Sequence, residues 1–185
     1  MATAFVLFNY FDQDADTLNL YGQIGEFTIH KSDDMIKMEF PAYKLEHIEI
    51  TDTMIEALGT IPLAVYKDRD ILFVLRDEDE VRYLQPDMEL ISKLDGACVA
   101  VTAKGTEYDC VSRVFAPKYG MTEDPVTGST HCMIAPYWSM RLNKPDITAF
   151  QASSRTGILY CECIGDKVII SGKAVLFSIN DIVAL

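Results

Sequence analysis

The residues best able to do chemistry together are crowded into residues 123–132, whose sequence is EDPVTGSTHC. The segment holds a carboxyl group (Asp124), a hydroxyl (Ser129), an imidazole (His131) and a thiol (Cys132). The proline that follows Asp124 disfavours the helical conformation for this acid, so we expect Asp124 on extended chain before a turn. A carboxyl group fixed beside a substrate can accept and return a proton. Asp124 is therefore the candidate catalytic acid.

The same segment is predicted to bind an anion. Gly128 permits a tight or left-handed backbone, and Thr127 or Ser129 can cap the helix that follows. The first amides of a helix have no partners within it and lie at the positive end of its dipole, so they attract a carboxylate or phosphate. We therefore predict that Gly128, Ser129, Thr130 and His131 bind substrate. An ordinary capped helix with a surface acid before it fits the same spacing.

Composition limits the elements and partners around this segment. The chain has 185 residues, of which 49% are hydrophobic, so it can bury a core as one domain or two small ones. With 16 basic against 28 acidic residues, the net charge is −12, which argues against nucleic acid and anionic membrane surfaces as partners. No apolar run is as long as a membrane span, and the apolar N-terminus lacks the flanks of a signal peptide.

The cysteines and histidines indicate neither a disulfide framework nor a metal site. The 5 cysteines are odd in number and have no framework spacing, which is typical of reduced thiols in the cytoplasm. The sequence has no Cys-x-x-Cys, and its 3 histidines are far apart. No glycine-rich nucleotide loop is present either. We therefore expect a cytoplasmic protein without metal or cofactor.

One apolar helix followed by three strands is predicted twice along the chain. In the second copy Gln151 lies 151 − 129 = 22 residues after Ser129, and in the first copy Gln23 lies 22 residues after Met1. The first copy comprises helix 2–11, expected to be buried, and strands 18–23, 27–31 and 35–40; the second comprises helix 130–141 and strands 147–151, 158–163 and 167–171. Other expected elements are helices 51–58, 78–84 and 87–94 and strands 63–66, 71–75, 98–102, 110–115 and 174–179. This is a mixed α+β pattern.

Five motifs in order resemble the PhzF-like family of phenazine biosynthesis, which shares the diaminopimelate-epimerase fold. They are RVFAP (113–117), EDPVTGSTHC (123–132), PYW (136–138), QASSR (151–155) and GKAV (172–175). The resemblance implies two similar domains, each a mostly antiparallel, barrel-like sheet around a central helix, with the active site between them. It implies that residues 1–45, joined by 174–185, are the remainder of an incomplete first domain. Residues 46–173 are then a complete second domain.

The resemblance also implies a function. Family members are cofactor-independent isomerases that transfer a proton on a small carboxylate-bearing substrate. By position, Asp124 is the second-domain acid, and the amides of Gly128 and Ser129 hold the substrate carboxylate. The family's catalytic glutamate and its Gly-His-Ala-Thr loop precede the first central helix, in which this sequence begins. We therefore expect impaired catalysis, and the alternative is a non-catalytic binding or interaction module.

Several residues keep two interpretations at this stage. Cys132 is either a thiolate base, as in cysteine-dependent epimerases of the same fold, or a buried structural thiol. His131 is either a substrate donor or a satisfied capping residue, and Arg113 either anchors the acid of the loop or covers a sheet edge. Pro136 is expected to kink its helix and free the carbonyl of Cys132. Unpaired strand edges in the incomplete domain predict a homo-oligomer.

Overall fold

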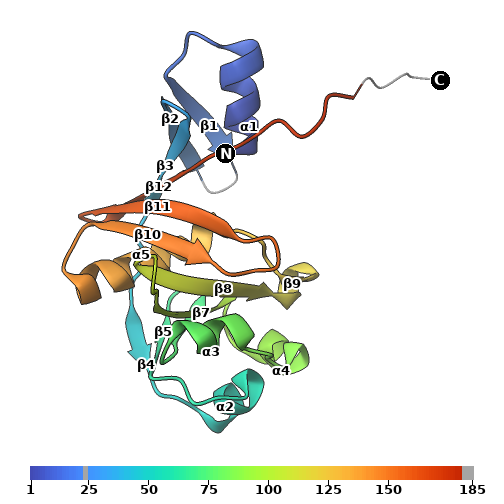
Figure 1. The fold of residues 1–185 in the computed structure, drawn as a ribbon, viewed down its shortest axis with the longest axis vertical. Coiled ribbons are helices and arrows are strands. Elements are labelled where there is room, and N and C mark those ends of the chain that lie inside the picture. The colour runs from blue at the N-terminus through green and yellow to red at the C-terminus, as the bar shows by residue number, and fades with distance from the viewer. Residues whose placement is uncertain (23–24, 181–185) are drawn as a thin grey trace. The chain divides into compact units, whose positions relative to one another are not determined.

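The computed structural model describes residues 1–22 and 25–180. Contacts divide the chain into two compact units (Figure 1). Unit 1 contains residues 1–39 and the chain from Ser171 onward, and unit 2 contains residues 40–170. The two units are described separately below.

Unit 1 is a short helix packed on an antiparallel meander of three strands. Its elements are α1 (Ala2–Val6), the π-helix η1 (Leu7–Phe11), β1 (Thr17–Gly22), β2 (Gly25–Ser32) and β3 (Met35–Pro41). Its buried core is formed by Ala4, Phe8, Ile29 and Ile36. The expectation of a buried helix over residues 2–11 is wrong, because the described strands cover only one of its faces and Phe11 is 78% exposed.

Unit 2 is built on a large mixed sheet with the order β12-β11-β10-β8-β7-β6-β5-β4, and β9 pairs with β8. Strands β6 and β7 run parallel, as do β8 and β10. In Figure 1 the long strands β8, β10 and β11 lie side by side. The strands are β4 (Glu46–Ile48), β5 (Ala64–Lys67), β6 (Ile71–Val74), β7 (Val99–Lys104), β8 (Cys110–Ala116), β9 (Met121–Glu123), β10 (Asp146–Gln151), β11 (Gly157–Ile164) and β12 (Lys167–Gly172).

The helices of unit 2 begin and end at residues with clear capping roles. They are α2 (Asp52–Leu58), α3 (Glu78–Tyr83), α4 (Met88–Lys93), the 3-10 helix η2 (Pro117–Tyr119) and α5 (Gly128–Leu142). The predicted cap of α2 is confirmed, because the Thr51 side chain accepts from the Met54 amide and Gly59 ends the helix at φ 73°. Asp77 and Asp87 cap α3 and α4 in the same way.

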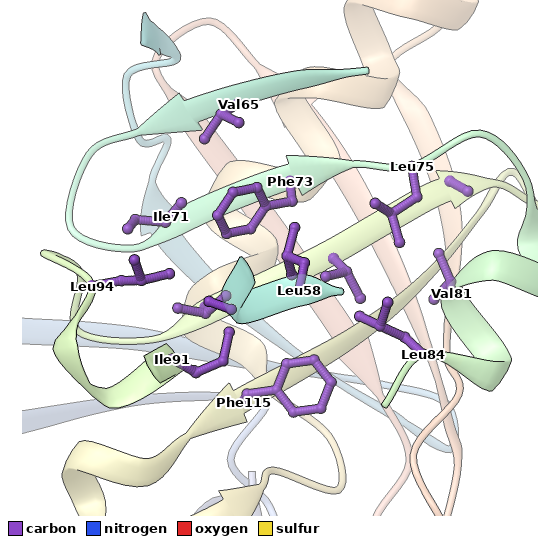
Figure 2. Packing of buried hydrophobic residues seen from close by; sticks show 14 of the residues in the cluster. Leu58, Val65, Ile71, Phe73, Leu75, Val81, Leu84, Ile91, Leu94 and Phe115 are labelled. Carbon is purple, nitrogen blue, oxygen red and sulfur yellow. The ribbon is translucent and has the colours of Figure 1, made fainter. Parts of the chain in front are cut away.

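A single apolar cluster joins α2, α3 and α4 to the sheet. Figure 2 shows Leu58 of α2, Phe73 of β6 and Phe115 of β8 pointing into this shared cluster. Burying each such side chain contributes about 1.5–3 kcal/mol relative to leaving it in water. This cluster fixes the strands whose ends carry the candidate site.

Helix α5 is the central helix of unit 2, as predicted. Eight of its residues are buried, and they cover most of the helix circumference. Pro136 lies inside it and has no N–H for the carbonyl of Cys132. That carbonyl instead accepts from the backbone amide of Tyr43 at 2.8 Å, which confirms that the proline frees it.

The two copies of helix plus three strands are present, with matching hairpins. Strands β2 and β11 are each 8 residues long. At the preceding turn, Gly22 pairs with Gly25 in one copy and Gln151 pairs with Gly157 in the other. Strand ends thus equate Gln151 with Gly22, whereas the expected mate, Gln23, lies outside the described residues.

Two other sequence expectations differ from the structure. The strand β4 was not anticipated, because its three residues are too short to show an alternating pattern. The predicted strand 174–179 is wrong, since none of the described strands pairs with it. Its apolar side chains are exposed instead, Phe177 to 98%. No helix in the described part of the chain is long and apolar enough to cross a membrane.

Candidate active site

Asp124 lies between β9 and α5, on the turn that the sequence indicated. Its backbone amide donates to the Val114 carbonyl at 2.9 Å, which continues the pairing of this segment with β8. Its carboxylate accepts from the amide of Val126 at 3.4 Å and is partly exposed. The acid is therefore fixed through its backbone, while its side chain keeps access to solvent.

The first turn of α5 is open to a ligand at its backbone. The N-cap residue Thr127 makes no capping hydrogen bond to the helix, in contrast to Thr51, Asp77 and Asp87 in the shorter helices. Gly128 follows at the first helical position, where an added Cβ would meet nothing within 4 Å. An anion can approach these amides closely, because neither a cap nor a side chain at this glycine blocks them.

The predicted binding residues divide into two groups. Ser129 and Gly128 are partly exposed, whereas Thr130 and His131 are fully buried. The Thr130 hydroxyl donates to the Asp70 carboxylate at 2.8 Å. The side chains of Thr130 and His131 thus face the protein interior, and a ligand contact by these two residues would have to use their backbone.

His131 is held as a neutral imidazole. Its Nδ1 lies 2.6 Å from the carbonyl oxygen of Thr127, so the proton must sit on Nδ1. Its Nε2 is then an acceptor for the Ser112 hydroxyl at 3.5 Å. Burial lowers the pKa of His131 to about 4, although the Thr127 carbonyl and the Asp124 charge act against this shift. The side chain therefore caps the turn without adding positive charge.

Asp70 is a buried acid that sequence reasoning missed. It is 0% exposed, and its Oδ1 accepts from the Cys98 amide at 3.1 Å and lies 3.2 Å from Arg69 Nε. Together with the bond from Thr130, these contacts tie the turn before β6 to the first turn of α5. The signal in the sequence is an acid directly before the apolar run of β6, but many surface turns look the same.

Gln151 and Ser153 hold the turn from the end of β10. The Gln151 side chain donates to the Asp124 carbonyl at 2.7 Å and accepts from the Thr127 amide at 2.7 Å. The Ser153 hydroxyl donates to the Pro125 carbonyl at 2.7 Å. The sequence marked both residues within a motif but gave them no role, because their partners are distant along the chain.

Arg113 anchors Glu123, the residue before the candidate acid Asp124, and not Asp124 itself. It binds the Glu123 carboxylate with two nitrogens, at 2.7 and 3.0 Å. Its Nη1 also donates to the carbonyl of Leu84, after the last turn of α3, at 2.7 Å. Such a bidentate pair is strong and directional, so Arg113 fixes the strand that leads into Asp124.

Comparison with known proteins identifies the family of this chain. The family model described as phenazine biosynthesis-like protein matches residues 1–179. The chain belongs to the phenazine biosynthesis-like family. An uncharacterized isomerase of Pseudomonas aeruginosa is 41% identical over 177 residues, which are 96% of this chain and 68% of that relative. The resemblance seen in the motifs is therefore confirmed.

Solved structures of the same family share the fold. A PhzF family protein of Enterococcus faecalis matches with a TM-score of 0.92 at 43% identity, over 96% of this chain and 68% of that one. A putative PhzC/PhzF protein of Clostridium difficile matches with a TM-score of 0.93 at 36% identity, over 99% and 71%. A predicted epimerase of P. aeruginosa, at 16% identity and a TM-score of 0.62, shares the fold alone. The expected α+β, diaminopimelate-epimerase-like class is confirmed.

The loop after β10 contains one residue in an uncommon backbone conformation. Thr156 has a φ of +58°. A β-branched residue rarely adopts this conformation, which glycine adopts at no steric cost. Thr156 keeps the turn because its amide donates to the Ser153 carbonyl and hydroxyl at 3.2 and 3.1 Å. These two hydrogen bonds hold Thr156 in the turn despite its local strain.

Cys132 is a structural thiol in this member of the family. It is 1% exposed, and burial raises its pKa to about 12, although the Arg69 charge acts against this shift. A thiol with this pKa stays protonated at neutral pH and is a poor base. The thiolate-base interpretation is therefore not supported.

Proposed function

We propose that this chain supplies the acid and the carboxylate-binding turn of a cofactor-independent isomerase. Asp124 would exchange a proton with a small substrate, and the first-turn amides of α5 would hold the substrate carboxylate. The observation that carries the proposal is the junction of these two groups at one braced turn, with Asp124 three residues before the N-cap of α5. The family supports an isomerase in general terms, since relatives are named isomerases.

Proton transfer requires that the catalytic acid can exchange a proton and that the neighbouring groups keep a fixed protonation state. The carboxylate of Asp124 is partly exposed and can take up and release a proton. The neutral imidazole of His131 and the protonated thiol of Cys132 do not compete for that proton. Fixed amide donors stabilise the substrate carboxylate without changing their own charge.

The test is a titration with benzoate, a small ring carboxylate, followed through the amide NMR signals of the protein. We expect shifts at residues 128–131. Ser129→Ala removes one hydroxyl donor, and we expect about fivefold weaker binding, equivalent to about 1 kcal/mol. Ser92→Ala is the matched control, because the Ser92 hydroxyl bonds only its own helix, at the Glu89 carbonyl.

Gly128→Val is expected to weaken benzoate more than Ser129→Ala, since a branched side chain at the first helical position blocks close approach to the amides. Asp124→Asn is expected to retain the fold and to abolish proton transfer on a true substrate. Benzoate shifts confined to other regions, with residues 128–131 silent, would reject this function. That result would favour the alternative of a non-catalytic binding module.

Self-association of the chain stays a prediction, which follows from the incomplete first domain. Unit 1 exposes large apolar side chains, including Phe11 at 78% and Tyr21 at 79%, and apolar surface of this kind favours association. We expect a homo-oligomer in light scattering at micromolar concentration.

A further inference from the structure

Gln151 is a fully buried polar residue at the end of strand β10. It closes β10 with 0% exposure, between Gly157 on β11 and Ser112 on β8. A buried amide is stable only when its donors and acceptor are bonded. Within the described part of the chain, the side-chain hydrogen bonds of Gln151 all go to two residues, Asp124 and Thr127. The side chain thus has its partners in the candidate site and not in its own sheet.

In these three hydrogen bonds the Gln151 side-chain amide is both a donor and an acceptor. Nε2 donates to the Asp124 carbonyl at 2.7 Å and to the Thr127 hydroxyl at 3.1 Å. Oε1 accepts from the Thr127 amide at 2.7 Å. A donor and an acceptor on one planar group are required here, so neither a carboxylate nor an apolar side chain of the same size reproduces the set. The bonds close a ring across the Asp124–Thr127 segment.

This ring sets the distance between the acid and the helix start. Asp124 carries the carboxyl group, and Thr127 is the N-cap from which the first amides of α5 follow. The Thr127 hydroxyl accepts from Gln151 and makes no capping hydrogen bond to the helix, the role that Ser and Thr often have at this position. One side-chain nitrogen of Gln151 therefore contacts both Asp124 and the uncapped N-cap residue.

We propose that Gln151 is a positioning residue of this site, which holds Asp124 and the first-turn amides of α5 at a fixed separation. The inference rests on the proposed function for its chemical meaning. The bracing itself is tested separately from ligand binding. Among the described residues, Gln151 hydrogen-bonds neither the Asp124 carboxylate nor the amides of residues 128–130, so it acts through Asp124 and Thr127 backbone groups.

The variant Gln151→Met keeps the volume of the side chain and removes its hydrogen bonds. The reporter is the Asp124 amide, which donates to Val114 and is not itself a partner of Gln151. We expect this amide to exchange with solvent about tenfold faster in the variant, because the loop opens locally when its brace is lost. We also expect benzoate to bind about tenfold more weakly, with the amide signals of residues 128–130 as the measure.

Thr102→Val is the matched control for a general loss of stability. The Thr102 hydroxyl is buried, donates to the Val111 carbonyl at 2.8 Å and accepts from Trp138 Nε1 at 2.9 Å, and neither partner belongs to the Asp124–Thr127 segment. At equal loss of global stability, this control is expected to leave the Asp124 amide and benzoate binding unchanged. Equal exchange at Asp124 in both variants would overturn the proposal.

A measurement on the unmodified protein decides the case if Gln151→Met does not fold. Both donors of the Gln151 side-chain amide have partners, so its NH₂ protons are expected to exchange slowly and to shift when benzoate binds. Rapid exchange of these protons would overturn the proposal. If wild-type protein binds no benzoate while the exchange results hold, the proposed function fails and the positioning role stands.

Discussion

Val126, in the candidate turn, leaves no room for a side chain at Gly157. Gly157 opens β11, and a Cβ added to it would lie 2.4 Å from Val126 Cγ2 and 3.2 Å from Cγ1. Real Cβ atoms do not approach another carbon to 2.4 Å, and valine is stiff at χ1, so it cannot swing away freely. In Gly157→Ala the segment that carries Val126 must therefore move.

The magnitude follows from two opposing terms. Overpacking of a close contact costs about 1–3 kcal/mol. Gly157 is not among the residues with positive φ, so alanine fits its backbone and restricts the unfolded chain, which offsets about 0.4–1 kcal/mol. We expect Gly157→Ala to lower the free energy of unfolding by about 1–2 kcal/mol. Benzoate binding is expected to weaken as well, because Val126 lies between Asp124 and Thr127.

A double-mutant cycle isolates this contact. Val126→Ala removes both methyl groups and leaves the Val126 Cβ, which lies 3.4 Å from the added atom, within ordinary contact distance. The double variant is therefore expected to be more stable than the sum of the single effects, with a coupling of about 1 kcal/mol or more. Urea unfolding of the four proteins measures it. Additive effects, or a Gly157→Ala change below about 0.5 kcal/mol, would refute the close packing of this turn.

Two further predictions concern the same neighbourhood. Thr156→Gly is expected to stabilise the protein by about 0.5–1 kcal/mol in thermal unfolding. The reason is that relief of the strained left-handed backbone exceeds the added entropy of the unfolded chain. A destabilised variant would show that a φ of +58° costs threonine nothing here. The pKa of His131 falls from 6.5 unfolded to about 4 folded, so its contribution is complete above pH 6.5 and is lost as pH falls through 4. In His131→Gln we expect a shallower loss of stability between these pH values, whereas an unchanged slope would exclude His131 as its source.

Local signals were sufficient for much of the fold. The caps of α2 were predictable because Thr51, Met54 and Gly59 lie within one short segment. The central helix α5 was predictable from its continuous apolar content. The failures came where burial depends on what covers a segment. Residues 2–11 and 174–179 are apolar in sequence, yet the described strands cover only one face of the first segment and do not pair with the second.

In the candidate site too, residues defined by their sequence neighbours were predictable, and residues defined by distant partners were not. Asp124 and Gly128 were found because proline and glycine determine their local backbone. The groups that hold them were not found, because Gln151 is 24 residues from Thr127 and Asp70 is 60 residues from Thr130. A single sequence contains no signal that pairs such positions. Their roles follow only once the strands are placed.

The proline inside α5 has a consequence for how unit 2 comes apart. A helix with a missing N–H has one carbonyl that it cannot satisfy alone, and here the Tyr43 amide at the entry to unit 2 satisfies it. The helix and the segment between β3 and β4 therefore share a bond that neither has when separated. We infer that they open as one cooperative segment, so that protection of the Tyr43 amide would report on the integrity of α5. A residue that weakens the helix as an isolated element thereby makes its folding depend on the chain that enters beside it.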